Sequence, residues 1–232
     1  MAPPPLPARR TSRQGPPAVG RLVGTGALIR LAARRDRVLG PLWVAAFALS
    51  AYGSAAATVG LYDTEAERVQ IAETINANPS FAALYGPVSD PTSTGQVSLF
   101  KFYAFGAALV GLLGLFLVVR HTRGEEEAGR TELLGAGVLG RWAPLAAGLA
   151  WTSAVVVGTG LLTALGLVGA GLDLVGSLSF GLAWVVTGLA FTVIGAVAAQ
   201  VASSSRGAKG LAGAVLGGAY LVRAVADGSP DG

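Results

Sequence analysis

Apolar runs of about 20 residues recur along this chain of 232 residues, and they constrain its fold more than any other feature. A run of that length, wound as a helix, spans the hydrocarbon core of a bilayer. Charged residues make up only 13% of the chain, about half the share that is usual in a soluble domain. The sequence therefore predicts an all-α, polytopic membrane helical bundle with about five transmembrane helices, at about 39–61, 100–119, 143–168, 177–202 and 211–226.

The segments before and after these runs have different compositions. Residues 1–20 are rich in Pro and Arg, which predicts a disordered tail. Residues 21–38 place Leu22, Leu28 and Leu31 on one helical face and gather Arg at the end, which predicts a helix in the membrane interface. We therefore assign a tail, an interfacial helix, one transmembrane domain at 39–226 and a polar C-terminal end at 227–232.

The longest polar loop besides 120–142 covers residues 62–99. Thr64 and Glu67 have the spacing of a capping box, in which each side chain bonds the other residue's backbone N–H. An apolar stripe containing Ala72 and Ile75 follows, so the pattern predicts an amphipathic helix at about 64–77.

The basic residues indicate the orientation of the chain in the membrane. If the N-terminus is cytoplasmic, 14 of the 17 Lys and Arg residues lie in cytoplasmic segments: eight before the first span, four in 120–142 and two in 203–210. Short cytoplasmic loops are enriched in Lys and Arg. The pattern predicts a cytoplasmic N-terminus, a cytoplasmic 120–142 loop and an external 62–99 loop.

Several kinds of chemistry find no support in the sequence. Cys is absent and His121 is the only His, so thiolate catalysis and multi-His metal sites are excluded. Residues 135–140, GAGVLG, match the spacing of a dinucleotide-binding loop, but a membrane span follows and the required acidic residue is missing. No phosphate-binding P-loop is present. We expect no enzyme activity, no cofactor on this chain and no nucleic-acid partner.

The charged loop at 120–142 carries the main functional hypothesis. Glu125, Glu126 and Glu127 are followed by an apolar tip, Leu133 and Leu134. A short helix with a charged body and an apolar tip can dock in a groove of a soluble partner. It can equally pack on its own membrane domain, and the residues alone leave both interpretations open.

The same loop resembles a known family. Residues 118–141, VVRHTRGEEEAGRTELLGAGVLGR, resemble a signature of actinobacterial ABC transporter permeases of the type 2 exporter family, especially those described as polyketide or tetronasin-like antibiotic exporters. Residues 28–44, 78–88 and 219–227 support the likeness.

The resemblance implies a mechanism and a set of partners. It implies an elbow helix at 21–38 and a cytoplasmic coupling helix at about 122–135 that docks on a separate ABC ATPase, where ATP and magnesium bind. It implies location in the bacterial plasma (inner) membrane. The candidate coupling residues are then Glu125, Glu126, Glu127, Gly129, Arg130, Glu132, Leu133 and Leu134.

Permeases of this family are about twice as long and contain two halves, and the chain resembles the first half only. We therefore expect a permease subunit, or half of one, that exports a hydrophobic small molecule such as an antibiotic together with a second half or an identical copy. Two alternatives stay open: a proton-coupled secondary transporter, and a truncated membrane fragment that transports nothing.

Overall fold

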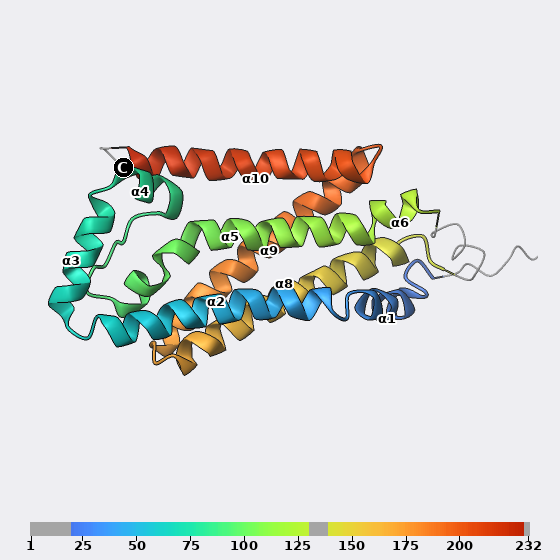
Figure 1. Cartoon of the computed structure of the whole chain (residues 1–232). Helices are drawn as coiled ribbons and strands as arrows, with labels where there is room; N and C mark the ends of the chain where they lie inside the picture. Colours follow the sequence, from blue (N-terminus) through green and yellow to red (C-terminus); the bar gives the residue numbers. More distant parts are fainter. Residues whose placement is uncertain (1–19, 130–138, 230–232) are drawn as a thin grey trace, which may run out of the picture.

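The computed structural model describes residues 20–129 and 139–229, and all regular elements within these ranges are helices. Five of them are long and apolar enough to cross a membrane, namely α2 (Leu39–Leu61), α5 (Thr94–His121), α8 (Ala143–Gly169), α9 (Leu174–Val201) and α10 (Ser205–Gly228). The chain is therefore an all-α, multi-pass membrane protein. Figure 1 shows the long helices running between two ends of the molecule, with α1 (Thr25–Arg35) and α6 (Arg123–Glu127) at one end and α3 (Glu65–Asn76) and α4 (Pro79–Tyr85) at the other.

Helix α9 lies against both α5 and α8 and forms the centre of the bundle. Two glycine pairs allow this close approach: a Cβ on Gly114 would lie 2.5 Å from the carbonyl oxygen of Gly188, and one on Gly160 would lie 2.5 Å from that of Gly181. Small residues at such crossings let helix backbones touch in a membrane protein. The Trp184 side chain is 1% exposed, and its Nε1 donates to the carbonyl oxygen of Phe102 at 3.2 Å.

Two spans differ from the limits expected from hydropathy. Helix α5 begins at Thr94 instead of residue 100, because the Ser93 side chain caps its first turn by accepting from the backbone N–H of Gln96. Helix α10 begins at Ser205 instead of residue 211, because Ser204 caps it by accepting from the backbone N–H of Gly207. It also continues to Gly228, so the polar end assigned to 227–232 begins inside the helix. Capped polar turns extend a helix beyond its apolar run.

The α3–α4 end closes the bundle through apolar packing, helix caps and one arginine. The expected capping box is present, with Thr64 and Glu67 bonded to each other's backbone N–H at 3.2 and 3.3 Å. Ala72 and Ile75 of α3 are buried against Val88 and Val97. Arg223 of α10 donates to the carbonyl oxygen of Ala83 in α4 at 2.6 Å, which ties the last span to this end.

Candidate functional site at the α1–α6 end

The structure places the first part of the predicted coupling helix in α6, which follows α5 after a single residue, Thr122. Glu125, Glu126 and Glu127 lie on α6, and Gly129 follows with a φ of +66°, a backbone conformation that favours glycine. The other four predicted coupling residues lie outside the described residues: Arg130, Glu132, Leu133 and Leu134.

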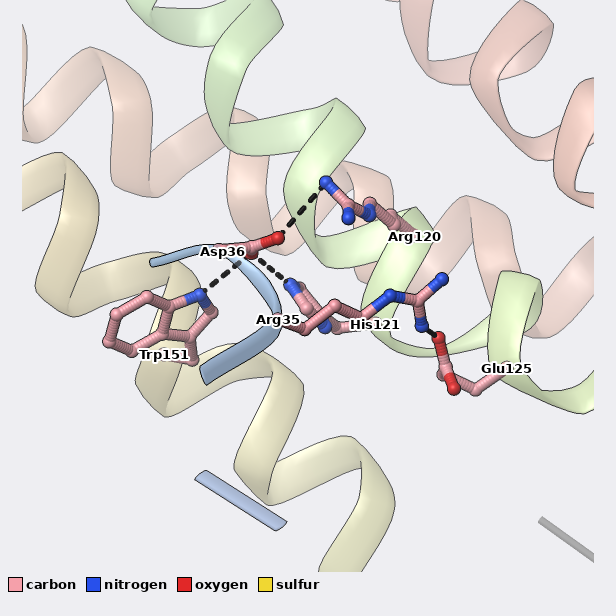
Figure 2. A network of polar contacts seen from close by, with 6 residues as sticks. All are labelled: Arg35, Asp36, Arg120, His121, Glu125 and Trp151. Atoms are coloured by element: carbon pink, nitrogen blue, oxygen red, sulfur yellow. Dashed lines mark hydrogen bonds and ion pairs between the residues drawn. The ribbon is translucent and has the colours of Figure 1, made fainter. Parts of the chain in front are cut away.

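One side of α6 is attached to α1. The Glu125 carboxylate forms an ion pair with the Arg35 guanidinium, which stands in the last turn of α1. Figure 2 shows the two side chains extended toward each other from their separate helices. The pair is partly exposed, with 36% of the Arg35 side chain and 20% of the Glu125 side chain accessible. It therefore contributes little to stability, and it links α6 to the last turn of α1.

The other side of α6 is attached to the turn between α9 and α10. Arg123 donates to the carbonyl oxygen of Ser203 at 2.7 Å, and Glu127 accepts from the backbone N–H of Ser205 at 2.8 Å. Arg123 also pairs with Glu126 at 2.8 Å. Of the three predicted coupling residues on α6, Glu125 and Glu127 therefore bind other elements of the chain, whereas Glu126 pairs within α6 and its side chain is 43% exposed.

A buried charged network lies beside this helix. The Asp36 side chain follows α1 directly and is fully buried. Its carboxylate lies 3.0 Å from Arg120 and 2.5 Å from Nε2 of His121, both on α5. Trp151 of α8 donates to the same carboxylate from Nε1 at 3.0 Å. Figure 2 shows the carboxylate between these three side chains.

The network joins three helices through one charge. Burying a carboxylate costs several kcal/mol unless a counter-charge and hydrogen bonds compensate. Here Arg120 supplies the counter-charge, while His121 and Trp151 supply the nitrogen contacts. Asp36 therefore fixes the end of α1 to α5 and α8, immediately behind the point at which Arg35 holds α6.

The contacts of this end join separate helices to one another. Within residues 20–129 and 139–229, no three His, Asp or Glu side chains are grouped so that they could hold a metal ion. Helix α6 is joined to α1 through Glu125 and to the α9–α10 turn through Arg123 and Glu127.

Asp36 and Trp151 were not among the predicted site residues. Asp36 is the only acid among residues 34–37, and His121 is the only His of the chain, standing at the end of an apolar run. These two exceptional residues contact each other across 85 positions of the chain. Two features of the sequence could have indicated this contact. One is a single acid in the basic cluster before the first span, and the other is a single His at the end of the second span.

The fold and the site define a class: a multi-pass helical membrane protein with a short polar helix fixed to its spans at one end. No protein-family model matches the chain. It is 38% identical over 223 residues to the multidrug efflux system permease protein Rv1217c of Mycobacterium tuberculosis. The matched region covers 95% of this chain but 40% of that relative, so the chain spans about 40% of the length of the relative it matches.

Proposed function

We propose that the chain forms the first membrane-spanning half of the permease of an ATP-driven efflux transporter. The observation that carries the proposal is the 38% identity to a multidrug efflux permease along almost the whole chain. The α1–α6 end adds physical support, because a helix tied to several spans can pass motion to them. The exported class, a hydrophobic small molecule such as a polyketide antibiotic, follows from the family resemblance.

In this proposal the α1–α6 end faces the cytoplasm, and a separate ABC ATPase carries ATP and magnesium. The ATPase contacts α6 through Glu126, whose side chain is 43% exposed and pairs with Arg123 of the same helix rather than with another element. When the ATPase moves, Glu125 transmits the displacement to α1 through Arg35, and Glu127 transmits it to the start of α10 through Ser205. The acidic residues therefore divide into one contact residue and two positioning residues.

A second permease half, or a second copy of this chain, completes the pathway in the proposal. Helix α10 contacts α4, α5 and α9 through part of its surface. Its other large apolar residues are exposed, including Leu211, Leu221 and Val222 at 48%, 64% and 73%. Such a surface suits either lipid or a further set of spans.

Co-purification with a candidate ABC ATPase tests the proposal. The tagged chain is solubilised in mild detergent, and ATPase retention and stimulation of ATP hydrolysis are measured. Glu126→Arg reverses the exposed charge on α6 and should lower ATPase retention about tenfold. The matched control is Glu73→Arg, at an exposed position of α3 at the other end of the molecule, and it should leave retention unchanged. Equal ATPase retention by both variants would contradict docking at α6. Leu133→Asp extends the same test to the predicted apolar tip.

The buried Asp36–His121 contact is the one observation that favours a proton-coupled secondary transporter instead. Titratable side chains that meet within a membrane protein often carry protons. Against this, Arg120 pairs with the same carboxylate and neutralises it without a proton. Proteoliposomes containing the chain alone discriminate the two: substrate uptake driven by a pH gradient and abolished by His121→Gln would favour the secondary transporter, and a requirement for the ATPase and ATP would favour the ABC exporter.

A further inference from the structure

A cavity of about 480 Å³ lies between α1, the end of α5, α6 and the start of α8. Its volume is in the range of pockets that hold small organic molecules. Its lining includes the apolar Leu28, Leu31 and Leu139 and the basic Arg34 and Arg35, with Glu125 as the acid. An amphiphile with an anionic head and an apolar tail matches this composition.

The charges of the lining favour an anion. Arg35 is paired with Glu125, but Arg34 is exposed and forms no ion pair with an acid in the described ranges 20–129 and 139–229. Arg34 therefore supplies the basic side chain for an anionic head group.

Other residues place this cavity at the level of lipid headgroups. Leu22 and Leu31 are 59% and 50% exposed on and beside α1, which suits a helix lying in the interface. Trp142 is 43% exposed, with the Arg141 guanidinium 5.0 Å above its ring, at the start of span α8. Tryptophan and arginine in this position are typical of the membrane–water boundary.

We propose that this cavity binds one anionic phospholipid, with its phosphodiester at Arg34 and an acyl chain along Leu28 and Leu31. The proposal rests on the proposed function only in placing the α1–α6 end at the cytoplasmic leaflet, where anionic lipids attract basic residues. Since Arg35 and Glu125 also line the cavity, the bound lipid lies directly against the link between α1 and α6. The lipid composition of the membrane then influences the position of α6.

Native mass spectrometry of the purified full chain tests the proposal, with phosphatidylglycerol and phosphatidylcholine as the two probes. We expect tighter binding of phosphatidylglycerol, and a loss of about fivefold in that affinity for Arg34→Gln, the effect of removing one basic contact. Arg37→Gln, an exposed arginine that does not line the cavity, should change the affinity less than twofold. Leu31→Asn should weaken lipid binding, and the similarly exposed Leu22→Asn should not.

Three results would overturn the proposal. Equal affinity for the two lipids would remove the anionic requirement, and equal losses from Arg34→Gln and Arg37→Gln would indicate attraction to the whole basic surface. Complete displacement of the lipid by inorganic phosphate would indicate a simple anion site. The measurement needs no ATPase. Failed lipid binding with normal ATPase retention therefore contradicts only this inference, whereas normal lipid binding with failed ATPase retention contradicts only the proposed function.

Discussion

The two ends of the molecule are both held by arginine, but in different ways. At the α3–α4 end, Arg223 donates to the carbonyl oxygen of Ala83 and pairs with Asp227, whose side chain is 29% exposed. At the α1–α6 end, Arg120 pairs with Asp36, which is fully buried and has two further partners. The α3–α4 end is closed mainly by packing and helix caps. At the α1–α6 end, charged side chains gather where α1, α5 and α8 meet.

This difference indicates where motion can enter the bundle. A short helix held by partly exposed ion pairs and backbone hydrogen bonds can move at low cost. The buried network behind it resists separation of α1, α5 and α8, because an unpaired buried charge is costly. In the proposed function, movement of α6 is therefore passed on as movement of several helices together. The α3–α4 end has no equivalent buried charge network within the described residues.

The largest expected effect comes from removing the buried carboxylate. Asp36→Ala leaves Arg120 without its buried partner and should destabilise the protein by about 3–5 kcal/mol. Asp227→Ala removes a partly exposed partner of Arg223 and should cost about 0–1 kcal/mol. Thermal unfolding of both variants in the same detergent checks the difference, and similar losses would show that the two ends are held equally.

The helix caps provide an intermediate test. Ser204→Ala and Thr64→Ala each remove a side-chain cap and should each cost about 1 kcal/mol. Only Ser204 stands in the turn that α6 contacts, through Ser203 and Ser205. Hydrogen exchange should therefore increase in α6 for Ser204→Ala and not for Thr64→Ala. Faster exchange in α6 for both variants would remove the distinction.

Apolar length predicted most of the fold. The run at 39–61 coincides with α2, and the expected limits of α8 and α9 differ from the observed ones by a few residues at most. The starts of α5 and α10 were placed too late, because Ser93 and Ser204 hold polar turns in helical form. Hydropathy does not register such turns, although a serine before them indicates the cap.

The candidate site was predicted only in part. The three consecutive carboxylates of α6 are visible in the sequence, but their partners are distant. Arg35 lies 90 positions from Glu125, and Ser205 lies 78 positions from Glu127. Asp36 is flanked by arginines and has the pattern of a solvated residue. Its burial depends on the packing of α1 against α8 and on its contacts with Arg120 and His121 of α5, which no local pattern encodes.

Exchanging the charges of Arg35 and Glu125 tests the central claim, that α6 transmits motion through its contact with α1. Because the pair is partly exposed, Arg35→Glu and Glu125→Arg should each change stability by less than about 1 kcal/mol. In complexes with the partner ATPase, each single variant should retain the ATPase but lose most ATP-driven transport, and the double exchange should restore it. Normal transport by both single variants would contradict the account.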